Sequence, residues 1–165
     1  MSPALRAGWA VRPAAAVLVA WSVVSSLAVY PHSLAYFNEL GGGPTGGHAH
    51  LLNSNIDWGQ DLFFLKRWQE QHPEAGTLRL AYGERVDPVA VGIRFTRATG
   101  EPLPGWYAVS VNRLRGEEGT FNYFLRFRPA AMAGYSIYIY HLTAAEAGSA
   151  RRELGLPPLS EVPSR

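Results

Sequence analysis

The chain has 165 residues, of which 47% are hydrophobic, so one folded domain is expected and global disorder is not. It contains no cysteine, which excludes disulfides, cysteine-based zinc sites and a cysteine nucleophile. The net charge is only +2, Lys66 is the sole lysine, and the arginines are scattered, so nucleic acid is not an expected partner.

The N-terminal segment is predicted to cross a membrane. The stretch from Pro13 to Pro31 is uncharged and has 19 residues, close to the ~20 that a spanning helix needs. Arg6 and Arg12 precede it, and no Lys or Arg follows before Lys66. The positive-inside rule therefore predicts a single-pass protein with a cytoplasmic N-terminus and a periplasmic, extracytoplasmic C-terminal part.

Two other interpretations of this segment stay open. One is a cleaved signal peptide with Ser26-Leu27-Ala28 as the cleavage site, and the other is a buried helix of a soluble core. The predicted organisation is a membrane-spanning helix over residues 1–31, a Gly-rich loop segment over 32–56, an extracytoplasmic α/β domain over 57–155 and a loose tail over 156–165.

Helices and strands are predicted to alternate after the Gly-rich stretch. Apolar residues recur at three- and four-residue steps from Trp58 to Trp68, which indicates a helix that ends before Pro73. Thr143 and Glu146 have the spacing of a capping box. The predicted elements are a helix over 58–72, a strand over 77–83, a helical turn from 87, a strand over 105–114, a helix over 119–129, a strand over 134–142 and a helix after 143.

This order predicts an α/β fold, a small three-layer sandwich with a mainly parallel sheet, because the strands are almost continuously apolar. Ligands of such sheets bind beyond the carboxyl ends of the strands. We expect Gly83, Asn112 and Thr143 at those ends.

The stretch "NSNIDWGQDL", residues 53–62, is the main candidate site. Asp57 and Asp61 are four residues apart at a helix start, and two such carboxylates can act as acid and base or hold a cation. The alternative, which we favour, is structural: Asp57 and Gln60 have capping-box spacing, and a negative charge suits the first helical turn. The candidate binding residues are Asn55, Asp57, Trp58, Gln60 and Asp61, and no catalytic residue is assigned.

The sequence predicts neither a metal site nor a cofactor. His48 and His50 form an H-x-H pair, but a zinc site needs a third ligand and the other histidines are distant in sequence. The patterns of a serine-hydrolase elbow and of a zinc protease are both missing from the sequence. Five aromatic residues are able to stack on sugar rings, although they are more typical of core and rim positions: Trp58, Trp68, Tyr82, Trp106 and Tyr107.

Four sequence blocks resemble one known family. They are "YPHSLAYFNELGGGPTGGHAHLLNSNIDWGQDL", "LAYGERVDPVAVGI", "GWYAVSVNRLRG" and "PAAMAGYSIYIYHL", which together extend from about Tyr30 to Leu142. The chain resembles, in the order of these blocks, the C-terminal extracytoplasmic domain of bacterial family 39 membrane glycosyltransferases, the dolichyl-phosphate-mannose–protein mannosyltransferase-like enzymes. The resemblance implies a parent enzyme that moves sugar from a polyprenyl-phosphate carrier.

The chain also departs from that family. Its enzymes carry many membrane helices and a catalytic acid in the first external loop, and this sequence has neither. Positions 48 and 50, often aromatic in the family, are histidines, and Asn53 replaces a usual Asp. None of the family's catalytic residues can be placed on this sequence, so the resemblance implies a part that is inactive alone.

Three functional hypotheses follow. The first is the C-terminal extracytoplasmic portion of such a glycosyltransferase, with the membrane, a polyprenyl-phosphate sugar and a companion membrane subunit carrying the catalytic core as partners. The second is a stand-alone, membrane-anchored module that binds a glycan or a lipid-linked sugar. The third, and weakest, is an independent hydrolase or transferase that uses Asp57 and Asp61.

Overall fold

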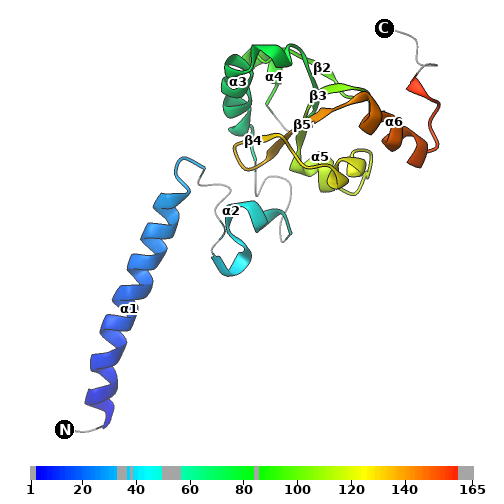
Figure 1. Ribbon diagram of the computed structural model, residues 1–165. Coiled ribbons are helices and arrows are strands. Elements are labelled where there is room, and N and C mark those ends of the chain that lie inside the picture. Colours follow the sequence, from blue (N-terminus) through cyan, green and yellow to red (C-terminus); the bar gives the residue numbers. More distant parts are fainter. Residues whose placement is uncertain (1–2, 33–36, 38, 50–56, 84–85, 160–165) are drawn as a thin grey trace.

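The N-terminal apolar segment forms one long helix that runs apart from the rest of the chain (Figure 1). In this computed structural model, residues 3–32, 37, 39–49, 57–83 and 86–159 are described. Helix α1 spans Pro3–Ala28, and its part Val11–Ala28 is long and apolar enough to cross a membrane. Apart from Ser25, all side chains of that part are exposed, whereas a core helix of a soluble domain is mostly buried.

Three short helical elements lie between α1 and the sheet domain. They are the 3-10 helix η2 at Glu39–Gly41, helix α2 at Gly43–Gly46 and the 3-10 helix η3 at Gly47–Ala49. Glycines with a positive φ, Gly42 and Gly43, allow the tight turn that begins α2. The predicted Gly-rich loop segment therefore contains single helical turns where it is described.

Five strands form one sheet in the order β2-β1-β3-β5-β4. Their bounds are β1 Leu78–Ala81, β2 Phe95–Arg97, β3 Gly105–Ser110, β4 Ala131–Ala133 and β5 Ile137–Leu142. Strand β1 pairs in parallel with β2 and β3, whereas β5 pairs antiparallel with both β3 and β4. The α/β class is confirmed, but the prediction of a mainly parallel sheet is wrong because the sheet is mixed.

The physical reason lies in the short connection between β4 and β5. Only three residues, Gly134 to Ser136, join these strands, and so short a connection permits only antiparallel pairing. Strand β5 consequently runs against β3, with Leu142 opposite Gly105. Thr143 therefore lies at the opposite end of the sheet from Gly83, and the prediction that they share an end is wrong.

Two hydrophobic clusters cover the two faces of the sheet. Leu78 and Leu80 point to the face that α3 covers, whereas Ala81 belongs to the opposite cluster. Strand β5 alternates in the same way, with Ile139 on the α3 side and Tyr140 on the other. Figure 1 shows α3 and α4 on one side of the sheet and α5 and α6 on the other.

Local sequence explains where most helices begin and end. Helix α3, Asp61–Gln71, is followed by Pro73, which opens the 3-10 helix η5 at Pro73–Ala75. Helix α4, Pro88–Val91, has Asp87 as a cap that accepts from the Val89 N–H at 3.0 Å. Helix α6, Ala144–Glu153, has the predicted capping box of Thr143 and Glu146 in full.

Two predicted elements differ in the structure. The predicted strand over 105–114 ends at Ser110, whose hydroxyl accepts from the Arg113 N–H and so begins helix α5, Val111–Arg115. The predicted helix over 119–129 is only a 3-10 helix, η6 at Asn122–Arg126. Strands β2 and β4 were not predicted.

Candidate functional site

The two predicted carboxylates lie where the start of α3 meets the turn between β4 and β5. Asp57 precedes α3 and Asp61 is its first residue. Their exposed fractions are 2% and 1%, so both acids are withdrawn from solvent. A buried carboxylate is costly unless it is hydrogen-bonded, so the contacts of each oxygen decide what this site can do.

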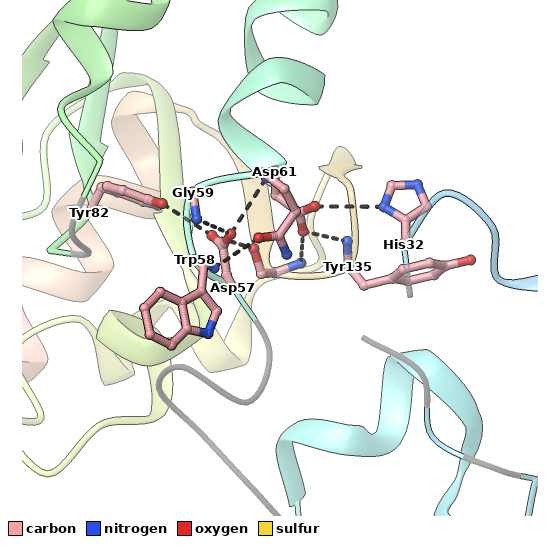
Figure 2. Close-up of polar contacts among 9 residues, drawn as sticks. His32, Asp57, Trp58, Gly59, Asp61, Tyr82 and Tyr135 are labelled. Atoms are coloured by element: carbon pink, nitrogen blue, oxygen red, sulfur yellow. Dashed lines mark hydrogen bonds and ion pairs between the residues drawn. The ribbon is translucent and has the colours of Figure 1, made fainter. Parts of the chain in front are cut away.

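Both oxygens of Asp57 are occupied by groups of the chain itself. Oδ1 accepts from the Gly59 N–H at 2.7 Å and, more weakly, from the Asp61 N–H at 3.5 Å. Oδ2 accepts from the Ser136 hydroxyl at 2.9 Å and from the Tyr82 hydroxyl at 3.2 Å (Figure 2). Asp57 thus joins the loop before α3 to the end of β1 and to the start of β5.

The predicted capping box of Asp57 and Gln60 is wrong, because α3 begins at Asp61 and its N-cap, Gln60, forms no side-chain cap hydrogen bond. Asp57 accepts from Gly59 and Asp61, and the Gln60 side chain accepts from the Trp58 N–H at 2.8 Å. The structural role predicted for both residues therefore holds, through two local turns in place of one reciprocal pair.

Asp61 is bonded on one oxygen and faces a histidine with the other. Oδ2 accepts from the backbone N–H groups of Tyr135 and Ser136, each at 2.9 Å. Oδ1 lies 3.6 Å from Nδ1 of His32, and neither of these two buried atoms has a hydrogen-bond partner. At this separation the two atoms are near enough for an ion pair but too far apart for a hydrogen bond.

His32 is held by rings as well as by this contact. Its ring centroid lies 4.3 Å from that of Phe64 on α3 and 4.9 Å from that of Tyr135 in the β4–β5 turn. Because His32 follows the end of α1 by four residues, the contact joins the chain just beyond the apolar helix to the sheet domain.

Burial is the main cause of a raised pKa at Asp61. The nearby negative charge of Asp57 raises this pKa further, whereas hydrogen bonds from Ser136 and Tyr135 act in the opposite direction. The net shift is upward, so the folded protein favours the protonated form of Asp61 more than the unfolded chain does.

Gly134 makes room for Asp61. It has φ +60°, and a Cβ built on it would lie 2.1 Å from Cγ of Asp61. Both the left-handed backbone and the close approach therefore require glycine at this position. A turn that binds a buried carboxylate through two N–H groups depends on this small residue.

The structure brings together some of the predicted site residues and adds others. Asn55 lies outside the described residues. Trp58 is 49% exposed, and Figure 2 shows its ring directed away from the two carboxylates. The partners of the two acids that sequence analysis did not predict are His32, Tyr82, Gly134, Tyr135 and Ser136, and the only available signal was that all five fall within the four resemblance blocks.

A separate cavity of about 170 Å³ lies at the carboxyl ends of β1 and β2. Its lining includes Tyr82, Arg97 and Arg113, and Arg113 forms an ion pair with Glu118 at 2.5 Å. The cavity occupies the edge where parallel strands usually bind ligands, but neither carboxylate lines it.

The arrangement around the two acids is suited to holding segments together. Three of their four oxygens accept hydrogen bonds from the chain, and the fourth faces His32. The fourth oxygen, Oδ1 of Asp61, is buried beside His32 without a hydrogen-bond partner, so neither acid is exposed to solvent in the described part of the chain. In the part of the chain that the structure describes, no three His, Asp or Glu side chains are grouped to hold a metal ion.

Comparisons with models of known protein families, with curated proteins and with solved structures found no match.

Because Gly134 packs closely against Asp61, replacing this glycine by alanine should lower the free energy of unfolding by more than the strain of a left-handed backbone alone. Gly155 has a similar φ of +67°, and a Cβ there would meet nothing within 4 Å. We expect Gly155→Ala to cost about 1 kcal/mol of unfolding free energy. Gly134→Ala should cost about 2–4 kcal/mol, because its methyl group also displaces Asp61. Denaturant unfolding of the full chain in detergent measures both, and equal losses would contradict the proposed fit.

The raised pKa of Asp61 predicts a pH effect. A raised pKa contributes stability that is full below the unfolded value of 3.8 and is lost as pH rises through the folded value. Asp61→Asn mimics the protonated acid and lacks this titration. The stability of the native protein relative to Asp61→Asn should therefore fall as pH rises from about 3 to neutrality. Unfolding curves at several pH values measure the difference, and a constant or rising difference would contradict the assignment.

Proposed function

We propose that this chain is the C-terminal extracytoplasmic portion of a membrane glycosyltransferase that uses a polyprenyl-phosphate-linked sugar. Two features support the proposal: the order of the four resemblance blocks, and the apolar helix α1 that precedes them. In this proposal the catalytic core resides in membrane helices outside this sequence, on a companion subunit or a separate segment.

The proposed topology follows from the charges that flank α1. Arg6 and Arg12 lie at its N-terminal half, and no Lys or Arg occurs between Arg12 and Lys66. The positive-inside rule then favours a cytoplasmic N-terminus and an extracytoplasmic sheet domain. This is the side on which polyprenyl-linked sugars are used in the proposed enzyme class.

The observation that carries the proposal is the internal use of the buried acids. A general acid or base must reach the proton that it transfers, within about 3.2 Å or through one water. Asp57 has both oxygens bonded to the chain, and Asp61 has one bonded and one against His32. Because the two acids hold segments of the chain together, they favour the interpretation as a non-catalytic part of a larger enzyme over that as an independent hydrolase.

An activity assay tests this proposal. The full chain, purified in lipid nanodiscs, should transfer no sugar from a polyprenyl-phosphate donor to a peptide or saccharide acceptor, because both carboxylates of the pair are buried. Transfer should appear only when a membrane protein with the missing catalytic loop is supplied. Steady transfer by the purified chain alone, abolished in Asp57→Asn and retained in Phe63→Ala, would overturn the proposal.

A second candidate function, a membrane-anchored module that binds a glycan or lipid-linked sugar, is favoured by the exposure of Trp58. Its ring is 49% exposed and points away from the acids that hold the loop. Aromatic rings of this kind can stack on sugar rings.

Calorimetric titration of the full chain with soluble saccharides and with a short-chain polyprenyl-phosphate sugar tests this candidate. If Trp58 forms the binding surface, Trp58→Ala should weaken binding about fivefold, corresponding to ~1 kcal/mol of aromatic contact. Phe63→Ala serves as a matched exposed aromatic control. No heat with any saccharide would remove this candidate and leave the first proposal in place.

A further inference from the structure

The His32 contact fixes which end of the sheet domain lies closest to the end of α1. The helix ends at Ala28, and His32 contacts Asp61 only four residues later. Four residues reach at most ~14 Å when fully extended, and this segment is turned, because the His32 N–H donates to the Val29 carbonyl at 2.7 Å. The start of α3 and the β4–β5 turn therefore lie close to the end of α1.

The chain also covers one side of the end of α1. Ser25 and Val29, four residues apart and so on one side, are buried, whereas Val24 and Leu27 are exposed. The connection is thus packed against the helix end. A membrane that contains α1 would lie directly beside the connecting segment and the start of α3.

Exposed apolar side chains occur in the segments just after α1 and around the start of α3. They are Tyr30 just after α1, Leu40 in η2, Trp58 before α3 and Phe63 in its first turn. Leu40 is 98% exposed and Phe63 65% exposed, although each is large and apolar. Outside α1, the remaining exposed large apolar residues in the described part of the chain are dispersed at Val89, Leu125 and Leu154.

The charge distribution distinguishes this end from the rest of the domain. No Lys or Arg occurs from residue 13 to residue 65, and the acids at 57 and 61 are buried. Trp and Tyr prefer the interface between lipid and water, where an aromatic ring meets both apolar chains and polar groups. Lys66 and the exposed Arg67 lie one helical turn beyond Phe63, a position from which long cationic side chains can reach lipid headgroups, so this end of the domain suits a membrane interface.

We propose that Tyr30, Leu40, Trp58 and Phe63 form a membrane-facing surface that rests in the outer headgroup region of the bilayer crossed by α1. This inference rests on the proposed membrane span. The His32–Asp61 contact holds the surface at that depth, so the sheet domain keeps one orientation on the membrane. The domain is then a positioned cap whose opposite end, with Thr143 and α6, faces away from the lipid.

Site-specific labelling in lipid tests the inference, and the lack of any cysteine in the sequence makes single labels straightforward. Leu40→Cys and Phe63→Cys would each carry an environment-sensitive fluorophore, in the full chain in nanodiscs of neutral lipid. Val89→Cys is the matched control, because Val89 is 66% exposed but lies on α4. Leu18→Cys, in the middle of α1, reports on the span itself.

If the inference is correct, the labels at positions 40 and 63 show blue-shifted emission. Nitroxides near the lipid headgroup should quench them several-fold more strongly than the label at position 89. The label at position 18 should be quenched best by nitroxides deep in the acyl chains. In a His32→Ala background, quenching at position 63 should decrease while that at position 18 stays unchanged.

Two outcomes would overturn the inference, and they are distinguishable. If position 18 is quenched by deep nitroxides but positions 40 and 63 behave like position 89, the span exists and the membrane-facing surface does not. If position 18 is not quenched, the span itself is wrong, and the proposed function fails together with the inference.

Discussion

The structure depends on one interaction, the burial of two neighbouring carboxylates against a turn of the sheet. Removing an ionised carboxylate from water costs several kcal/mol unless hydrogen bonds replace the lost solvation. Here the replacements come from the Ser136 and Tyr82 hydroxyls and from backbone N–H groups. The loop before α3, strand β1 and the β4–β5 turn must therefore all be in place before the acids can be buried.

Because the acids must pack closely against the turn, the site also depends on Gly134, its smallest residue. Asp61 approaches the β4–β5 turn only because Gly134 has no side chain, and the fourth oxygen finds only His32. The burial of the two acids thus comes with hydrogen bonds from the chain itself on three of their four oxygens. A raised pKa at Asp61 has a structural cause, the desolvation of an acid that ties segments together.

Sequence analysis predicted the features that depend on neighbouring residues. The capping box of Thr143, the helical turn that begins at Asp87 and strands β1, β3 and β5 all follow from patterns a few residues long. Strands β2 and β4 have three residues each, too short for any period, and they exist because a longer strand pairs with them. Ser110 was read as part of a strand because Val111 continues the apolar run, although it begins α5.

The partners of the acids could not be predicted for the same reason. Ser136 and Tyr82 are 79 and 25 residues from Asp57, and nothing local indicates that a hydroxyl at either position points toward a carboxylate. The direction of β5 also decided where Thr143 lies, and that direction is set by the turn at Gly134. Contacts between residues far apart in the sequence thus explain both the wrong position predicted for Thr143 and the missed partners of Asp57.

The loop that contains both acids has two sides, and its unusual composition follows from them. Asp57 points inward to Ser136 and Tyr82, whereas the next residue, Trp58, points outward. Gly59, with φ +114° and with Val86 2.3 Å from where its Cβ would lie, permits the sharp turn that brings Asp61 back inside. The buried acids anchor the loop, so a large aromatic ring is held at the surface on a rigid base. Beginning a helix does not require an exposed aromatic ring at this position. The exposed ring of Trp58 is therefore the part of this loop for which a functional role is expected.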